Sequence, residues 1–127
     1  MRAYIAVSYS KRKLVDEEIT SIIETLNTFE ISSFVFVDNY KFNASQEKEM
    51  MLQAMEDIEN CDILIAETSE KGIGIGIEVG FAKAKGKIVI YVRHRNAEHS
   101  TTVSGISDFQ IVYSNSEDLK IKLIDTL

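Results

Sequence analysis

The sequence contains no proline and no tryptophan, and only one cysteine, Cys61. A single cysteine cannot form an internal disulfide, and without a histidine at ligand spacing it does not indicate a zinc site. This usage is typical of a reducing cytoplasm, where we expect the protein to reside. No apolar run approaches the ~18–20 residues that cross a bilayer, and the first residues lack a signal-peptide pattern, so we expect no membrane partner.

Basic residues are also few, since 14 lysines and arginines stand against 20 aspartates and glutamates, for a formal net charge of −6. Nucleic-acid polymers are bound largely through cations that neutralise phosphates, so we expect no nucleic-acid polymer as partner. A small ligand at a local site remains compatible with this charge. The length of 127 residues and the 45% hydrophobic content predict one domain, spanning 1–127, with a sizeable core.

Short apolar runs, several rich in β-branched residues, alternate with segments of helical apolar spacing. The runs predict five strands, at 3–8, 33–37, 62–67, 87–92 and 109–113. Parallel neighbours need crossover connections, and their strands must be apolar on both faces. The sequence therefore predicts an α/β fold, a flavodoxin-like or Rossmann-like three-layer sandwich with a five-stranded parallel sheet.

Helix ends are predicted from capping residues. Ser45 and Ser116 are expected N-caps, and Gly86 is expected to close the helix that follows a glycine-rich turn. The polar segment 93–107 is expected to be irregular. The methionines at 50, 51 and 55 are expected to fill the core.

Ligands of open parallel sheets bind at the carboxyl ends of the strands. The candidate binding residues by this rule follow the predicted strands, and they are Ser8, Tyr9, Ser10, Asp38 and Glu67. Asp38 and Glu67 are also candidates for a general acid by position. Asp62 begins its strand, so we expect it at the opposite edge with a structural role.

The glycines at 72, 74, 76 and 80 suggest a dinucleotide-binding turn, but Val79 stands where the third glycine of the G-x-G-x-x-G spacing belongs. Binding of NAD in that manner is therefore rejected, and no cofactor is expected. Gly72, Gly74 and Gly76 instead allow a ligand to approach the backbone closely, beside free N–H groups at a helix start.

Glu78 is the only charged residue between Lys71 and Lys83, and its neighbours are apolar. A partly buried carboxylate is implied. It is either a first-turn glutamate stabilised by the helix dipole or a nucleophile or acid/base whose pKa is raised by desolvation.

The segment 93–104 collects positive charge and hydroxyls, among them Ser100 and Thr101, and either holds a phosphate or is an ordinary solvated loop. His94, Glu98 and His99 match no metal motif, so no metal site is expected.

The run DILIAETSEKGIGIGIEVGFAKAKGKIVI resembles the central motif of the nucleoside 2-deoxyribosyltransferase family, and the resemblance extends from Tyr4 to about Leu119. The family contains transferases that exchange bases between deoxynucleosides and N-hydrolases of 2′-deoxynucleoside 5′-monophosphates. The resemblance implies that Glu78 is the nucleophile and that Ser8 contacts a phosphate. It also implies that Ser100 reaches the ligand of a neighbouring subunit, and hence a homodimer or larger assembly.

Four positions depart from the family pattern. Val7 stands where the glycine before the first-strand serine is expected, and Ser10 stands where an arginine is expected. Gly72 stands where transferases have aspartate and hydrolases have serine, and Ala54 stands where an aspartate is expected. Neither branch is indicated by Gly72, but Ser8 and Ser100, together with the basic segment 93–104, favour the hydrolase branch. The resemblance then implies cleavage of the N-glycosidic bond of (2′-deoxy)nucleoside 5′-monophosphates, releasing the free base. A base-exchanging transferase and a non-catalytic nucleotide-binding module are the alternatives, as is a related activity on other N-glycosides such as ribonucleotides.

Overall fold

The structure, a computed structural model, describes residues 1–127 and contains one five-stranded sheet whose strands are all parallel. In chain order the strands are β1 (Arg2–Val7), β2 (Ser32–Val35), β3 (Ile63–Glu67), β4 (Ile88–His94) and β5 (Phe109–Tyr113). Their spatial order is β2-β1-β3-β4-β5. The fold class expected from the sequence is confirmed.

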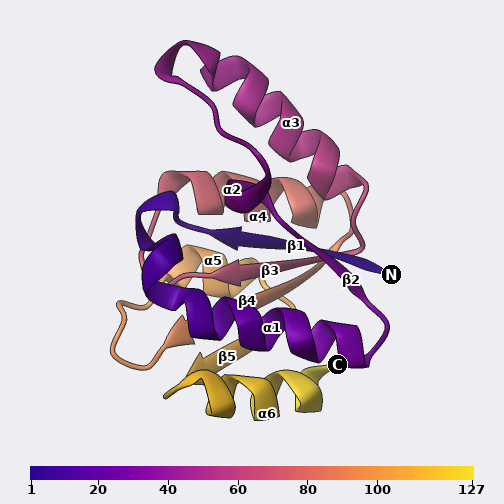
Figure 1. The fold of residues 1–127 in the computed structure, drawn as a ribbon, viewed down its shortest axis with the longest axis vertical. Coiled ribbons are helices and arrows are strands. Elements are labelled where there is room, and N and C mark those ends of the chain that lie inside the picture. Colours follow the sequence, from indigo (N-terminus) through magenta and orange to yellow (C-terminus); the bar gives the residue numbers. More distant parts are fainter.

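Helices cover both faces of this sheet (Figure 1). One face carries α1 (Asp16–Thr28) and α6 (Ser116–Thr126), which pack against each other. The other face carries α2 (Phe36–Asn39), α3 (Glu47–Glu59), α4 (Ile73–Ala84) and α5 (Thr101–Ile106). Two 3₁₀ helices, η1 (Tyr9–Val15) and η2 (Ala44–Gln46), precede α1 and α3. No helix combines the length and apolar character that a membrane span requires.

Each side of the sheet has its own apolar core, because successive strand residues point to opposite faces. Ile5 and Ile65 pack with α1 and α6, whereas Tyr4 and Leu64 pack with α3 and α4. All four side chains are almost completely buried, which explains the uninterrupted apolar runs that predicted the strands.

Most strand ends lie within one residue of the sequence prediction, but β2, β4 and the segment 93–107 differ from it by more. β2 is an edge strand whose pairing with β1 ends at Val35, so Phe36 and Val37 leave the sheet and enter α2. β4 continues to His94 because β5 pairs with it that far. Within the segment expected to be irregular, α5 forms and buries Val103 against the α4 side of the sheet.

Two predicted N-caps are also wrong. Asn43, rather than Ser45, caps the start of η2, because its side chain accepts from the Ser45 N–H while the Gln46 side chain accepts from the Asn43 N–H. Asn115, rather than Ser116, caps α6 by accepting from the Asp118 N–H at 2.8 Å. The prediction for Gly86 is confirmed, since it follows α4 in the left-handed region at φ 74°.

Candidate active site

The site is built around the start of α4. Gly72, in extended backbone and with no side chain to cap the helix, precedes Ile73, so Gly74 and Gly76 lie within the helix rather than in a turn before it. Glu78 consequently sits in the second turn, not the first. The helix includes this glycine-rich segment because Ile75, Val79 and Ala82 recur at helical spacing and all face the core.

A cavity of about 260 Å³ lies between the end of β1, α2, α3 and the start of α4. Four candidate residues from the sequence, Ser8, Tyr9, Gly72 and Gly74, line it together with Glu78. The remaining wall is apolar and comprises Val7, Phe36, Val37, Met50, Met51, Ala54 and Ile75. Glu78 is therefore the only charged side chain that lines this cavity.

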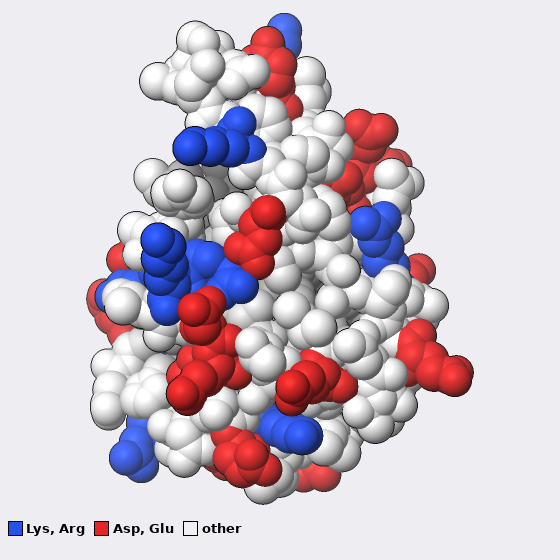
Figure 2. Space-filling view, in the orientation of Figure 1, with Lys and Arg blue, Asp and Glu red and all other residues white.

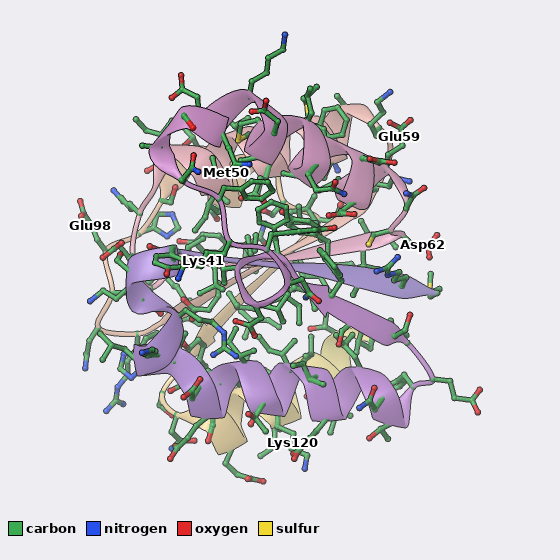
Figure 3. The ribbon with its side chains drawn as sticks, turned by 45° about the horizontal axis from the view of Figure 1, so that its top comes forward. Lys41, Met50, Glu59, Asp62, Glu98 and Lys120 are labelled. Carbon is green, nitrogen blue, oxygen red and sulfur yellow. The ribbon has the colours of Figure 1, made fainter.

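Met50 and Met51 are half-buried wall residues, so the expectation that they fill the core is wrong. The first part of α3 stands away from the sheet and packs only near its end, as Figure 1 shows, and Met50 lies on this outlying part (Figure 3). Met50 and Met51 therefore face the cavity rather than a closed interior.

The Glu78 carboxylate pairs with Tyr4, whose hydroxyl donates a hydrogen bond to Glu78 Oε2. Burial raises the pKa of Glu78 to about 7, and the hydrogen bond from Tyr4 opposes that rise. The pKa of the Tyr4 hydroxyl is raised in turn, by burial and by the neighbouring Glu78 charge. The sequence interpretation missed Tyr4 because a tyrosine within an apolar strand resembles a core residue. Its hydroxyl was the available signal, since a buried tyrosine usually finds a polar partner.

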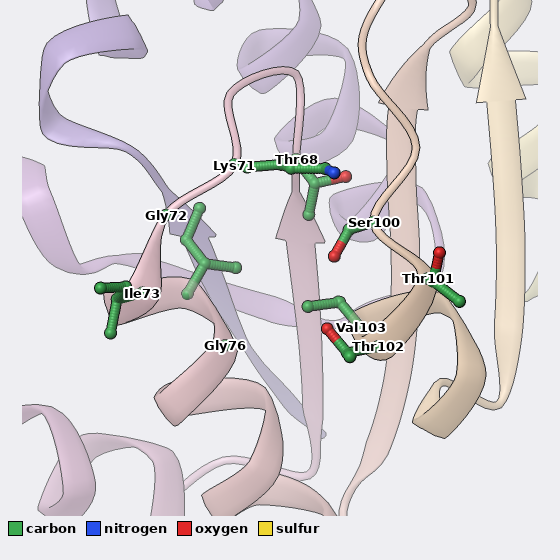
Figure 4. Close-up of a pocket in the computed structure, with 10 residues that line it drawn as sticks. Thr68, Lys71, Gly72, Ile73, Gly76, Ser100, Thr101, Thr102 and Val103 are labelled. Carbon is green, nitrogen blue, oxygen red and sulfur yellow. The ribbon is translucent and has the colours of Figure 1, made fainter.

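A second cavity, of about 460 Å³, lies on the other side of the α4 start, between α4 and α5 (Figure 4). Gly72 and Ile75 line both cavities. Ser100, Thr101 and Thr102 line this second cavity, and Figure 4 shows the side chains of Ser100 and Thr102 pointing toward α4. Gly76 lines this second cavity, not the one that contains Glu78.

Ser8 and Ser10 form a cluster with Glu70 at the rim of the Glu78 cavity. The hydroxyls of Ser8 and Ser10 both donate to Glu70 Oε1, at 2.7 and 2.5 Å, and lie 3.0 Å from each other. These hydrogen bonds lower the pKa of Glu70. The basic residues of η1 follow directly, and Figure 2 shows lysine and arginine side chains gathered over its place at the left of the view.

Three candidate residues line neither cavity: Ser10, whose hydroxyl bonds Glu70, and the carboxylates Asp38 and Glu67. Asp38 accepts from Arg12 Nε and Nη2, both at 2.8 Å. Glu67 is only 1% exposed and accepts from the Ser69 N–H and from the hydroxyls of Ser69 and Tyr113. Burial raises the pKa of Glu67.

The histidines and Asp62 are engaged elsewhere. His94 Nε2 lies 3.0 Å from the Ser114 carbonyl oxygen, and His99 lies beside Tyr91. No three metal-ligating side chains come together. Asp62 lies at the amino edge of the sheet, as predicted, where it accepts from the Arg2 N–H at 2.9 Å.

Comparison with known proteins finds a matching family and similar folds. The family model of nucleoside 2-deoxyribosyltransferase matches residues 3–121. A CMP N-glycosidase from Clostridium botulinum superposes with a TM-score of 0.74 at 22% identity, covering 100% of both chains. A 2-deoxyribosyltransferase from Bacillus psychrosaccharolyticus superposes with a TM-score of 0.72 at 13% identity, covering 94% of this chain and 90% of the other.

A 2-deoxyribosyltransferase from Leishmania mexicana superposes with a TM-score of 0.64 at 16% identity, covering 98% of this chain and 97% of the other. At such identities the superpositions establish a common fold. A comparison with curated protein sequences finds no match.

Proposed function

The chain belongs to the nucleoside 2-deoxyribosyltransferase family, a family of enzymes, and we propose that it cleaves the N-glycosidic bond of (2′-deoxy)nucleoside 5′-monophosphates with Glu78 as nucleophile. The observation that carries this proposal is the Glu78 carboxylate. It is the only charged group lining an otherwise uncharged and mostly apolar cavity at the carboxyl edge of the sheet, and a buried tyrosine hydroxyl donates a hydrogen bond to one of its oxygens.

The geometry of Glu78 suits attack on an anomeric carbon. Tyr4 occupies Oε2, whereas Oε1 accepts no hydrogen bond from the protein and is free to approach C1′ of the sugar. Attack forms a glycosyl ester, and the electron pair of the C1′–N bond leaves with the base, which takes up a proton. A water molecule then attacks C1′, gives its proton to solvent and releases Glu78 as carboxylate.

The transition state has oxocarbenium character, which a nearby carboxylate stabilises. Without a 2′-hydroxyl the deoxyribosyl cation forms more readily, so one strong nucleophile in a small site suffices. Tyr4 acts as the positioning residue, because its hydrogen bond keeps part of the Glu78 population ionised despite burial.

The wall that would contact the base is apolar and carries no carboxylate other than Glu78. Ala54 lines it where the family pattern has an aspartate, and Asp57, one turn further along α3, does not line it. Asp57 accepts instead from Gln53 at 3.2 Å. The base is accordingly held by apolar contact with side chains such as Phe36 and Met50, and its departing nitrogen is protonated from solvent.

We also propose that the enzyme is a homodimer or a larger homo-oligomer. Ser100 lines the second cavity, on the other side of the α4 start from Glu78. Within one chain, therefore, Ser100 and Glu78 line different cavities. Large side chains that line the two cavities are exposed, namely Ile73 at 85% in the second cavity and Tyr9 at 74% in the Glu78 cavity. A second copy that covered them would remove apolar surface from water and bring its Ser100 to this site.

The decisive experiment incubates the purified protein with each deoxynucleoside 5′-monophosphate and measures the released base by chromatography. Glu78→Ala and Glu78→Gln should each lower kcat/KM at least ~10³-fold, because the covalent step disappears. Asp62→Asn, at the opposite edge of the sheet, is the matched carboxylate control and should stay within about threefold of the parent rate. Near-normal turnover by Glu78→Gln would refute the proposed mechanism.

One observation favours the transferase alternative, namely that Glu70 already occupies the hydroxyls of Ser8 and Ser10. Measurements of kcat/KM for a deoxynucleoside and its 5′-monophosphate, each with and without a second base, discriminate the two activities. Base exchange together with a preference for the nucleoside would assign the chain to the transferases. If no base is released from any nucleoside or nucleotide, ribonucleotides included, the chain is instead a non-catalytic nucleotide-binding module.

A further inference from the structure

The Ser8–Ser10 pair is an oxyanion site that the chain fills with a carboxylate of its own. Two hydroxyls separated by 3.0 Å converge on the same oxygen of Glu70. The side chain of Glu70 makes no other hydrogen bond and no ion pair, and it is partly exposed on the loop between β3 and α4. The Glu70 carboxylate is therefore held only by these two hydroxyls, at the surface rather than in the core.

The surroundings of this site favour negative charge. The site lies at the start of η1, and the Lys11 charge also lowers the pKa of Glu70. Glu70 therefore stays ionised throughout the neutral range. A phosphate group offers the same acceptors as a carboxylate and carries more charge, so the same hydroxyls suit it at least as well.

The position of the pair relates it to the cavity that contains Glu78. Ser8 lines that cavity with its neighbour Tyr9, whereas Glu70 approaches Ser8 from the rim. A ligand with its anomeric carbon at Glu78 and an anionic group at Ser8 would meet the Glu70 carboxylate. Two anions cannot share these hydroxyls, since the charges repel at hydrogen-bonding distance.

We propose that Glu70 is an intramolecular competitor for the anionic group of the substrate, which occupies the Ser8 and Ser10 hydroxyls in the free enzyme and must leave them before a 5′-phosphate binds. This inference rests on the proposed function for the identity of the ligand. It makes Glu70 a specificity-determining residue, because its carboxylate weakens the binding of phosphorylated ligands and leaves neutral ones unaffected.

The test measures binding rather than turnover, with 2′-deoxyribose 5-phosphate and 2′-deoxyribose as probes that need no knowledge of the base. Isothermal titration calorimetry compares the parent chain with Glu70→Gln, Glu70→Ala and Glu24→Gln. Glu24 is exposed on α1, on the other face of the sheet, so Glu24→Gln matches the change in net charge. A triple variant, Ser8→Ala and Ser10→Ala with Glu70→Gln, asks whether any gain uses the same hydroxyls.

Both Glu70 variants should lower the Kd for 2′-deoxyribose 5-phosphate at least about tenfold, an effect that weakens as salt increases. The Kd for 2′-deoxyribose should change less than about twofold, Glu24→Gln should match the parent, and the triple variant should lose the gain.

Several results would overturn the proposal. It fails if the Glu70 variants bind the sugar phosphate no tighter than Glu24→Gln does, or if no variant binds it at all. It fails equally if Glu70→Ala weakens the binding of 2′-deoxyribose, which would make Glu70 a ligand of a neutral hydroxyl. A binding gain in a chain that releases no base would instead refute the proposed function and leave this inference standing.

Discussion

The carboxyl group of Glu78 experiences two opposing influences. Desolvation raises its pKa to about 7, and the hydroxyl of Tyr4 restrains that rise. As the proposed nucleophile, Glu78 must be ionised, so the ionised fraction of Glu78, and with it the rate, should increase as the pH rises through about 7. This balance makes the pH profile a direct report on the Tyr4 contact.

Tyr4→Phe should move the rising limb of kcat/KM to higher pH, because the group that lowers the Glu78 pKa is lost. The loss of rate should therefore be larger at pH 6 than at pH 9. Tyr113→Phe is the matched control, since Tyr113 also donates to a buried carboxylate, that of Glu67, but lines neither cavity. A Tyr4→Phe profile with an unchanged or lower midpoint would contradict this role for Tyr4.

The same pKa predicts a stability effect. The folded-state pKa of Glu78 is about 7, above the ordinary value of 4.5, so the native state binds the proton more tightly and loses stability as pH rises from about 4.5 to 7. Glu78→Gln removes this penalty and should raise the free energy of unfolding at pH 8, by about 3 kcal/mol at most. The gain should vanish near pH 4. Urea denaturation at both pH values measures it, and equal stability at pH 8 would argue against a buried, charged Glu78.

At the residue scale, sequence reasoning singled out Glu78 because it is the only charged residue in an apolar helical segment and so cannot be part of a solvent-exposed charged face. It did not find Tyr4 or Glu70, because their importance lies in contacts with Glu78 and Ser8 that are distant in sequence. It also placed Asp38 and Glu67 near the ligand from strand ends alone. The strand-end rule predicts that these residues lie at the carboxyl edge of the sheet. It does not predict that Asp38 is hydrogen-bonded to Arg12 and Glu67 to Tyr113.

At the scale of elements, α4 is notable because glycines occupy three of its positions, and a Cβ built at any of them would have no neighbour within 4 Å. Glycine within a helix is less favourable than alanine by roughly 0.5–1 kcal/mol. Packing therefore does not explain these residues. Gly74 leaves the wall of the Glu78 cavity bare, and we interpret it as room for the ligand.

Gly80→Ala should accordingly stabilise the protein by about 0.5–1 kcal/mol and leave kcat/KM unchanged, since Gly80 lines neither cavity. Gly74→Ala should give a similar gain in stability but lower kcat/KM several-fold, because its methyl group enters the Glu78 cavity. Thermal unfolding and steady-state kinetics of the two variants measure these effects. Equal kinetics for both would show that the bare wall has no role in binding.

Sequence patterns predicted the strands and long helices well, because burial on both faces of a strand or on one face of a helix leaves a clear periodicity. The short helices α2 and α5 escaped prediction. α5 has the sequence TTVSGI, with weak helix formers, and it forms where Val103 packs against the body of the protein. Such elements depend on tertiary contacts that local sequence does not encode.

At the scale of the whole molecule, the exposed apolar side chains around the cavities lead to a prediction about assembly. Sedimentation equilibrium at micromolar concentration should show a homodimer or larger species and no monomer. Ile73→Glu, which places a charge on the most exposed of these side chains, should shift the population toward monomer and reduce activity together. A fully active monomer would remove Ser100 of a neighbouring copy from the site.

The central position of β1 also constrains how the chain folds. β1 is made first, yet it lies between β2 and β3, and its pairing with β3 joins Ala3 to Ile63. Non-local parallel pairing of this kind slows folding, because a long loop must close before its contacts stabilise the chain. During synthesis, therefore, about sixty residues are added after β1 before β3, its second neighbour, is available for pairing. Glu78, the partner of Tyr4, is made later still. A fragment that ends before β3 should remain unfolded, so the contact between Tyr4 and Glu78 should form only late in folding.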